Sequence, residues 1–440
     1  MRNEERRVKN SIAMNKIVRY VMSLLAVMVL SLPLQAQVTI DDGEEVVEDR
    51  EETEVADSAM VDSLTADTLR LPWPQMVQVG IDKLLKSKMF ETSQVGIMVW
   101  DLDADSCIYR FRERQLMRPA STMKLVTAIT ALDKLGGSYQ FKTQLKYTGT
   151  IEDGVLKGDV YCIGGMDPRF NTDDMTAFVT SLKDMGVDSI CGSIYADRSM
   201  KDADLLGEGW CWDDDNPVLS PLVYSRKDIF MDRFLAKLRD AGIVYTGFGT
   251  SEKRCPPSAF TVCTRFHTMD QILHKMMKES DNLYAESMYY QIAASTGNRP
   301  ASAKSARSVE RQLIHKVGLD PQRYKLADGS GLSLYNYLSA ELEVKLLRYA
   351  YRNENILPHL QQSLPIAGVD GTLKKRMKSG FAHGNVRAKT GTLTGIISLA
   401  GYCKASNGHE LCFSIINNGI MHGNNARNFA DKVCELLCEP

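Results

Sequence analysis

The chain of 440 residues lacks the features that point to metal or nucleic-acid chemistry. It has no recognisable zinc-ligand motif, since His409-Glu410 has no second histidine at the required offset. Its formal net charge is only −2, and its one basic cluster lies at the N-terminus. A protein that binds nucleic acid usually carries a basic patch on its folded part. We therefore expect no metal, no other cofactor and no nucleic-acid partner.

The ten cysteines include no Cys-x-x-Cys pair, so their spacing does not define a disulfide framework. One pair can be argued from geometry. If Asn407-Gly408 is a two-residue type I′ turn, Cys403 and Cys412 lie opposite each other at a non-hydrogen-bonded position, where α carbons approach to about 4.5 Å. That distance allows a disulfide, but two buried free thiols on one face of the sheet fit the same pattern equally well.

The N-terminal residues carry export signals. Basic residues up to Arg19 precede an apolar run over residues 20–34, and Ala36 is a plausible cleavage point. The run is short for a membrane span. We therefore expect a signal peptide over residues 1–36 and a periplasmic protein, with membrane association only if the leader is retained. Residues 37–70 are mostly acidic and polar, which predicts a disordered linker.

The run from Pro119 to Lys124 carries a distinct chemical signal, because it places a hydroxyl and an amine three residues apart at the start of a predicted helix. This spacing puts Lys124 one turn from Ser121 on the same helix face. An amine there can take the proton of a serine nucleophile, and the first-turn N–H groups favour an oxyanion beside the hydroxyl. Ser-x-x-Lys is common by chance, however, and a capping serine is the simpler interpretation of this motif alone.

Two further motifs supply possible partners. Residues 280–282, Ser-Asp-Asn, fall between two predicted helices, where they could present a hydroxyl and an amide to a cleft. Residues 389–392, Lys-Thr-Gly-Thr, lie on a predicted strand, with Gly391 offering close backbone approach for a ligand. Taken singly, a helix cap at Ser280 and an exposed charge at Lys389 are simpler. The three motifs in this order resemble the signature of class A β-lactamases and penicillin-binding proteins.

The chain from about Leu71 to its end is similar to the D-alanyl-D-alanine carboxypeptidase/endopeptidase family, the low-molecular-mass class C penicillin-binding proteins. In that family a β-lactamase-like domain is interrupted between the nucleophile helix and the Ser-x-Asn motif. Residues 164–168 and 210–213 look like its first inserted domain, and a nested second insert is missing or vestigial after Arg226. The runs that carry the resemblance are Ser280–Glu286, Asp328–Ser333, Leu364–Leu373 and Ala388–Leu393.

The resemblance and the apolar patterning together predict an α+β fold. A β-lactamase/transpeptidase-like domain, with a five-stranded antiparallel sheet flanked by helices, is expected from residues 71–140 and 262–440. Two of its strands precede Ser121 and three lie near the C-terminus. Residues 141–261 are expected to form an inserted, mostly β or α+β domain. Its aromatic and acidic run over residues 210–215 is more simply a packed loop than a sugar or metal site.

The resemblance implies a serine-type hydrolase whose substrates are peptidoglycan peptides that end in D-Ala-D-Ala, or D-amino-acid cross-links, with β-lactam antibiotics as covalent inhibitors. The serine of the first motif would be the nucleophile and the lysine its base, and the second motif would pass the proton to the leaving amine. The third motif would hold the terminal carboxylate and complete the oxyanion hole. The predicted catalytic residues are Ser121, Lys124, Ser280, Asn282 and Lys389, and the predicted substrate-binding residues are Thr390, Gly391 and Thr392.

Two other functions share these residues. A β-lactamase would turn over the penicillin adduct in seconds, but the sequence shows no glutamate loop of the class A type. An inactive cell-wall-binding scaffold would not need Ser121, Lys124 and Lys389 together. The sequence leaves open carboxypeptidase against endopeptidase preference, the deacylation base and the oligomeric state.

Overall fold

The computed structural model describes residues 71–212, 216–247 and 249–439. The signal peptide and acidic linker expected over residues 1–70 lie outside these residues, as does the acidic part of the run over residues 210–215. Within the described part, no helix combines the length and apolar character needed to cross a membrane.

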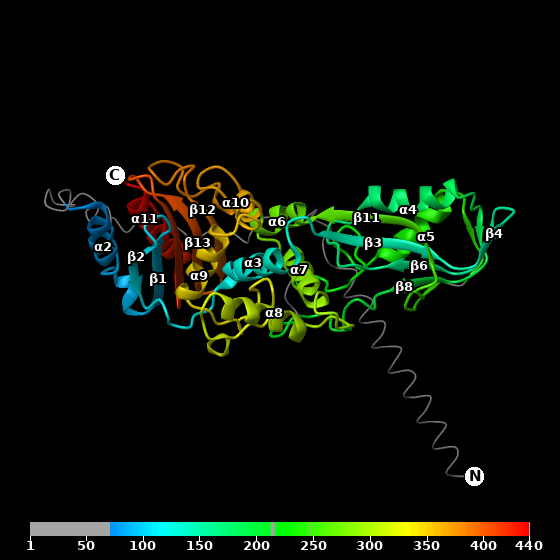
Figure 1. Cartoon of the computed structure of the whole chain (residues 1–440), viewed down its shortest axis with the longest axis horizontal. Coiled ribbons are helices and arrows are strands. Elements are labelled where there is room, and N and C mark those ends of the chain that lie inside the picture. The colour runs from blue at the N-terminus through cyan, green and yellow to red at the C-terminus, as the bar shows by residue number, and fades with distance from the viewer. Residues whose placement is uncertain (1–70, 213–215, 248, 440) are drawn as a thin grey trace, which may run out of the picture. The chain divides into compact units, whose positions relative to one another are not determined.

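Strands from both ends of the described chain form one antiparallel sheet (Figure 1). They are β1 (Gln94–Asp101), β2 (Ser106–Phe111), β12 (Arg387–Leu393), β13 (Ile396–Lys404) and β14 (Glu410–Asn418). The order β12–β13–β14–β1–β2 confirms the five-stranded sheet that the sequence predicts. Alternating residues of β1 face opposite cores, Ile97 and Val99 on one side and Met98 on the other.

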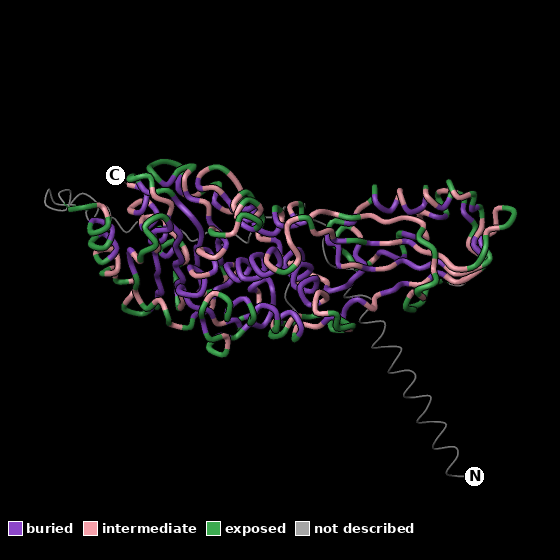
Figure 2. Tube along the Cα trace, in the orientation of Figure 1, coloured by how far each residue is buried: buried purple, intermediate pink, exposed green. Residues whose placement is uncertain are grey.

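Helices cover both faces of this sheet. On one face, α2 (Trp73–Leu84) and α11 (Gly423–Cys438) pack against Ile97 and Val99. On the other, α3 (Met123–Leu135) and α9 (Ala340–Tyr351) pack in the core that holds Met98. Residues 123–132 of α3 are all buried, which makes it the central helix of this part (Figure 2). The other helices here are α6 (Met269–Lys278), α7 (Asn282–Ala294), α8 (Ala303–Lys316) and α10 (Leu357–Ser363), with 3-10 turns η3 (Lys88–Glu91), η4 (Ala120–Thr122), η5 (Pro321–Arg323) and η6 (Gly371–Leu373).

The described residues between 140 and 268 form two further sheets, where the sequence predicts the inserted domain. One contains β3 (Gln140–Tyr147), β6 (Val160–Ile163), β8 (Ile194–Asp197), β10 (Thr250–Glu252) and β11 (Phe260–Thr268), in the order β10–β8–β6–β3–β11. The other contains β4 (Thr150–Glu152), β5 (Val155–Lys157), β7 (Ser189–Ile190) and β9 (Val244–Tyr245). Helices α4 (Thr172–Asp184) and α5 (Phe230–Asp240) share one apolar core with strands of both sheets. Strand β11 continues past residue 261, the predicted boundary, and leads directly into α6.

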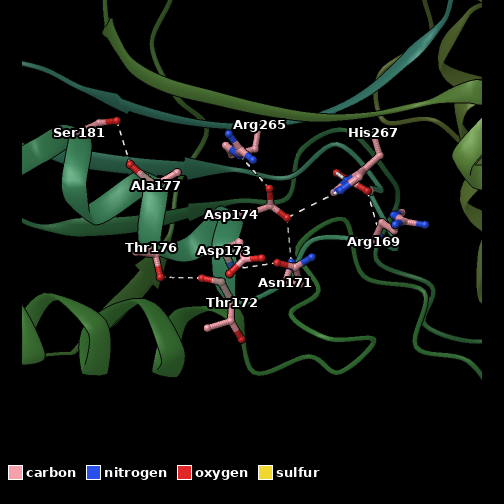
Figure 3. Close-up of polar contacts among 11 residues, drawn as sticks. Arg169, Asn171, Thr172, Asp173, Asp174, Thr176, Ala177, Ser181, Arg265 and His267 are labelled. Atoms are coloured by element: carbon pink, nitrogen blue, oxygen red, sulfur yellow. Dashed lines mark hydrogen bonds and ion pairs between the residues drawn. The ribbon is translucent and has the colours of Figure 1, made fainter.

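A polar network ties β11 to α4 and to the loop that precedes it (Figure 3). Arg265 Nε donates to Asp174 Oδ1 at 2.7 Å, and His267 Nδ1 lies 2.8 Å from Asp167 Oδ2. The Asn171 N–H donates to the second oxygen of Asp174 at 3.0 Å. Both aspartates are buried, and a buried carboxylate without partners would be destabilising. The network therefore holds the strand that returns the chain to α6.

The geometric argument for a disulfide between Cys403 and Cys412 is wrong. Cys403 pairs with Leu411, and Cys412 pairs with Tyr402. The hairpin loop is one residue longer than a two-residue turn, because the Ala405 N–H donates to the His409 carbonyl at 2.9 Å. A register shift of one residue moves a side chain to the other face of a sheet. The two thiols accordingly belong to different cores, and both are free.

We predict that no Cys403–Cys412 cross-link exists in the folded protein. Alkylation in denaturant without reductant, followed by peptide mass spectrometry, should recover Cys412 as the alkylated thiol. A control digest of reduced protein gives the full alkylation signal. Detection of the cross-linked peptide would contradict the register described above.

Candidate active site

Ser121 lies in η4, the 3-10 turn that runs directly into α3. The predicted helix start is therefore confirmed, with a tighter turn at its first residues. Ala120 adopts a φ of +49°, a conformation that is uncommon for a residue with a side chain. The Thr122 hydroxyl donates to the Pro119 carbonyl at 2.9 Å. These contacts hold the Ser121 hydroxyl at the beginning of the buried helix.

The Lys124 amine is fully buried and has three polar neighbours. Its Nζ lies 3.0 Å from Ser121 Oγ, 2.7 Å from Asn282 Oδ1 and 2.8 Å from the Ser330 carbonyl oxygen. The amide and carbonyl oxygens only accept hydrogen bonds, so they take two N–H groups of the amine. A neutral amine then has its lone pair left for the Ser121 hydroxyl, which can donate. The arrangement fits a base that receives the serine proton.

The electrostatic environment favours the neutral form of this amine. Desolvation by burial lowers the pKa of Lys124 from 10.5 to about 8, although the carboxyl groups of Asp328, Glu286 and Asp281 oppose the shift. Burial disfavours the charged form of a lysine because the surrounding protein solvates it less well than water. About a tenth of Lys124 is thus neutral at pH 7 and about half at pH 8, far more than for a lysine with the ordinary pKa, as a general base requires.

The Ser-Asp-Asn motif lies at the junction between α6 and α7, as the sequence predicts. Ser280 has a φ of +61°, and the surrounding structure must hold this unfavourable conformation. Asp281 caps α7 by accepting the Tyr284 N–H at 3.2 Å. The same carboxylate forms an ion pair with Arg226, a residue of the predicted inserted domain. The junction is therefore supported from both parts of the chain.

Lys389 connects the sheet to this junction. Its buried Nζ donates to Ser280 Oγ at 2.8 Å and to the Thr390 carbonyl at 2.8 Å. The Thr390 hydroxyl donates to Thr372 Oγ1 at 2.7 Å. Thr392 is exposed at the end of the same strand. The simpler interpretation of Lys389 alone, an exposed strand charge, is therefore wrong, since the amine is buried and contacts the second motif.

Gly391 is needed for close packing within the protein itself. A Cβ at this position would stand 2.0 Å from Ser398 Oγ, 2.6 Å from the Pro119 carbonyl oxygen and 3.2 Å from the Ser121 nitrogen. These distances leave no space for a side chain. The close backbone approach expected at Gly391 is therefore made to the turn that carries Ser121, which brings β12 against the predicted nucleophile.

The structure brings all three motifs together. Lys124 joins Ser121 to Asn282, and Lys389 joins the strand to Ser280. Of the predicted substrate-binding residues, Gly391 contacts the Ser121 turn, while Thr390 and Thr392 flank it on β12. These positions show a common site, and the role of each residue remains a prediction.

Sequence reasoning missed several residues that support the site. Asp328 accepts hydrogen bonds from the Gly331 N–H at 2.8 Å and from Trp210 Nε1 at 2.8 Å. Trp210 thus packs as a loop residue, in a core cluster that joins Met200 and Leu219 of the predicted inserted domain to Tyr289 of α7. Glu286 accepts hydrogen bonds from the loop that contains Asp328, and Thr372 accepts one from the Thr390 hydroxyl of the third motif. A carboxylate at Glu286, four residues after Asn282, was the available signal, because that spacing puts both on one helix face.

Among the described residues, one group of side chains has metal-ligand chemistry, namely Asp101, Asp103 and His409. It lies by the β13–β14 hairpin, away from the three motifs in sequence. His409 Nδ1 lies 2.8 Å from Asp101 Oδ2, and the other Asp101 oxygen accepts two backbone N–H groups. These polar groups satisfy one another, so the group is explained as a structural contact of the turn.

The fold and the converging motifs define a serine acyl-transfer enzyme of the β-lactamase/transpeptidase-like class. The particular family follows from comparison with known proteins. A model of the D-Ala-D-Ala carboxypeptidase 3 (S13) family matches residues 77–225 and 222–439, and the chain belongs to this family. It is therefore a serine-type D-Ala-D-Ala carboxypeptidase, and the resemblance seen in the sequence is confirmed.

Two relatives match most of the chain. D-alanyl-D-alanine carboxypeptidase DacB of Haemophilus influenzae is 26% identical over 434 residues, which cover 80% of this chain and 90% of that protein. The D-alanyl-D-alanine carboxypeptidase of Actinomadura sp. is 26% identical over 438 residues, or 77% of this chain and 80% of that protein.

Solved structures agree on the fold. The crystal structure of penicillin binding protein 4 (dacB) from Haemophilus influenzae aligns with a TM-score of 0.74 at 24% identity, covering 81% of this chain and 97% of that one. The same protein complexed with a β-lactam aligns with a TM-score of 0.68 at 26% identity, covering 80% and 98% of the two chains. The predicted β-lactamase/transpeptidase-like fold is thereby confirmed.

We predict that kcat/KM for D-Ala release rises about tenfold per pH unit below about pH 8 and levels off above it, because the neutral Lys124 amine accepts the serine proton. The rate should be measured from pH 6 to 9 with a D-Ala-D-Ala peptide. Circular dichroism over the same range controls for unfolding. A flat profile would contradict a base that titrates in this range.

Proposed function

We propose that this chain is an exported DD-peptidase that cleaves D-Ala-D-Ala termini, D-amino-acid cross-links or both in peptidoglycan through an acyl-enzyme on Ser121. The observation that supports this proposal most directly is the buried Lys124 amine, whose Nζ lies 3.0 Å from Ser121 Oγ. Membership of the carboxypeptidase family supports the substrate class. The β-lactam complex of the Haemophilus influenzae protein supports the further proposal that penicillins acylate the same serine here.

Acylation begins when Ser121 Oγ attacks the carbonyl carbon and its proton passes to the neutral Lys124 amine. The backbone N–H groups of Ser121 and Thr392 would stabilise the tetrahedral oxyanion, where loss of one donor typically costs about 3 kcal/mol of barrier. Lys389, with the hydroxyls of Thr390 and Thr392, would hold the terminal carboxylate. The substrate is then fixed at both ends of the reacting bond.

Collapse of the intermediate breaks the peptide bond, and the leaving nitrogen needs a proton. Lys389 Nζ donates to Ser280 Oγ at 2.8 Å. That bond occupies an oxygen lone pair and leaves the Ser280 hydroxyl hydrogen available for the leaving amine. Asn282 would orient the substrate amide and the Lys124 amine together. Ser280 recovers its proton from the Lys124 ammonium, which returns to the neutral amine.

Deacylation requires a base for the attacking water. Lys124 is the titratable side chain in hydrogen-bond contact with Ser121 in the described structure, and it is neutral again once the leaving amine has been protonated. We assign activation of the water to this amine. The water proton goes to Lys124 and then to Ser121 Oγ as the acyl bond breaks, which regenerates the free enzyme.

Muropeptide digestion tests this proposal directly. Purified wild-type protein should release D-Ala or split cross-linked dimers, as read by mass spectrometry, and should label with a fluorescent penicillin. Ser121→Ala should lose both signals, since the variant lacks the hydroxyl oxygen on which the acyl bond forms. Ser406→Ala, at an exposed serine in the β13–β14 turn, should match the wild type. Labelling of the Ser121→Ala protein would overturn the assignment.

The same protein separates the remaining alternatives. A β-lactamase would hydrolyse the penicillin adduct within seconds, whereas a DD-peptidase keeps it for many minutes. A scaffold would neither label nor cleave. Release of free D-Ala identifies carboxypeptidase activity, and conversion of dimers to monomers identifies endopeptidase activity.

Export is the second part of the proposal and rests on the basic and apolar N-terminal run that ends near Ala36. We expect a C-terminally tagged protein to appear in the periplasmic fraction with residues 1–36 removed. Mass measurement of the purified protein gives the mature N-terminus. A cytoplasmic protein that retains this segment would contradict export, and a membrane-bound one would show that the leader is kept as an anchor.

A further inference from the structure

Glu286 is a fully buried carboxyl group behind the Lys124 amine. It lies on α7, one turn after Asn282, and its side chain is enclosed by the core. One oxygen, Oε1, accepts the N–H groups of Gly329 at 3.0 Å and Ser330 at 2.8 Å. The carboxyl group thereby fixes two successive peptide units of the loop that follows α8.

This loop is also the one that contacts the base. The Ser330 carbonyl oxygen accepts from Lys124 Nζ at 2.8 Å, and the Gly329 carbonyl accepts from the Thr127 hydroxyl at 2.7 Å. Gly331, with a φ of +81°, packs so closely on the residue before Ser121 that a Cβ would stand 1.9 Å from the Ala120 carbonyl oxygen. The loop that Glu286 holds therefore contacts both the base, Lys124, and the turn that carries the nucleophile, Ser121.

Several charged groups face Glu286 from the elements packed around it. Lys124 lies on α3, Asp328 in the loop, and Glu310 and Arg307 on α8. Burial, with the charge of Asp328 as a smaller cause, raises the pKa of Glu286 to about 8, which is the range in which Lys124 titrates. The carboxyl and the amine therefore titrate over the same pH range.

A cavity of about 200 Å³ reaches Glu286 and Asp328 from the side of Arg307 and Glu208. The Glu208 side chain is 45% exposed and pairs with Arg307 at 2.9 Å. Two buried carboxyl groups next to the loop that contacts Lys124 therefore line this cavity.

We propose that Glu286 is a positioning residue for acylation, whose carboxylate holds the Ser330 carbonyl against Lys124 and stabilises the ammonium that forms when that amine takes the serine proton. The proton moves from Ser121 to Lys124 while the negative charge moves to the tetrahedral oxyanion, so the step itself creates no net charge and Glu286 exchanges no proton. A carboxylate near a buried amine favours its charged form. The inference rests on the proposed role of Lys124 as base.

Glu286→Gln tests the charge, because the amide keeps an acceptor oxygen for the two N–H groups but cannot be an anion. Without the nearby anion the pKa of Lys124 falls, so the rise of the acylation rate with pH should move to lower pH by about one unit. The plateau rate should fall about tenfold, since the forming ammonium loses a nearby carboxylate and the amine is a weaker base. The measurement is the rate of fluorescent penicillin acylation from pH 5.5 to 10.

Glu310→Gln is the matched control. This glutamate is also fully buried near the cluster, but the N–H groups of Gly329 and Ser330 donate to Glu286 and not to it. Glu310→Gln should leave the plateau of the acylation rate unchanged, and it should shift the pH at which that rate rises much less than Glu286→Gln does. A Glu286→Gln profile that superimposes on the wild type would overturn the proposal, as would an equal effect from Glu310→Gln.

Glu286→Asp keeps the test decisive if the glutamine variant fails to fold. The shorter side chain remains ionisable but no longer reaches both N–H groups, so the pH at which the rate rises should stay near its wild-type value while the plateau falls. A shift of that rise to lower pH in this variant would overturn the proposal. Loss of labelling in the wild type would instead refute the proposed function, so the two failures are distinguishable.

Discussion

Burial of the Lys124 amine is the constraint on which the rest of the structure depends. Removing an ammonium-sized group from water costs several kcal/mol unless the protein supplies acceptors in good geometry. Here the polar neighbours come from three separated parts of the chain, at Ser121, Asn282 and Ser330. The fold must therefore fix α3, α7 and the loop at residues 328–331 relative to one another. Complete burial of the first ten residues of α3 provides that rigidity.

The predicted inserted domain takes part in this support. Arg226 pairs with the Asp281 carboxylate that caps α7, and Trp210 Nε1 donates to Asp328 in the loop behind Lys124. The first contact reaches the middle residue of the Ser-Asp-Asn motif, and the second reaches the loop that contacts Lys124. The predicted inserted domain thus supports the site structurally. Its polar network around Asp174 and His267 stabilises the strand that returns the chain to α6.

Much of the fold could be predicted because the elements of the peptidase part have clear apolar periods, such as β1 and α3. The site could be predicted because its chemistry is concentrated in three short motifs. The pairing of Cys403 with Cys412 was wrong because one extra residue in a turn reverses the face of every following side chain. The spacing from Asn282 placed Glu286 on the helix face of the site, but its hydrogen bonds could not be predicted because their donors are amides more than forty residues away along the chain. Contacts of that kind appear only when the loop and the helix are placed together.

The strand order has a consequence for how the chain is made. Strand β1 lies between β2 and β14, so an early strand completes its pairing with one that is synthesised more than 300 residues later. Until β14 exists, β1 lacks one of its two neighbouring strands. Such long-range pairing slows folding, because a large loop must close before the contact forms. The intervening strands β3 to β11 pair with partners closer in sequence, so their two sheets can form before β14 pairs with β1. Folding of the sheet is therefore complete only when β14 is present. A chain truncated before this strand would present an open sheet edge to other molecules.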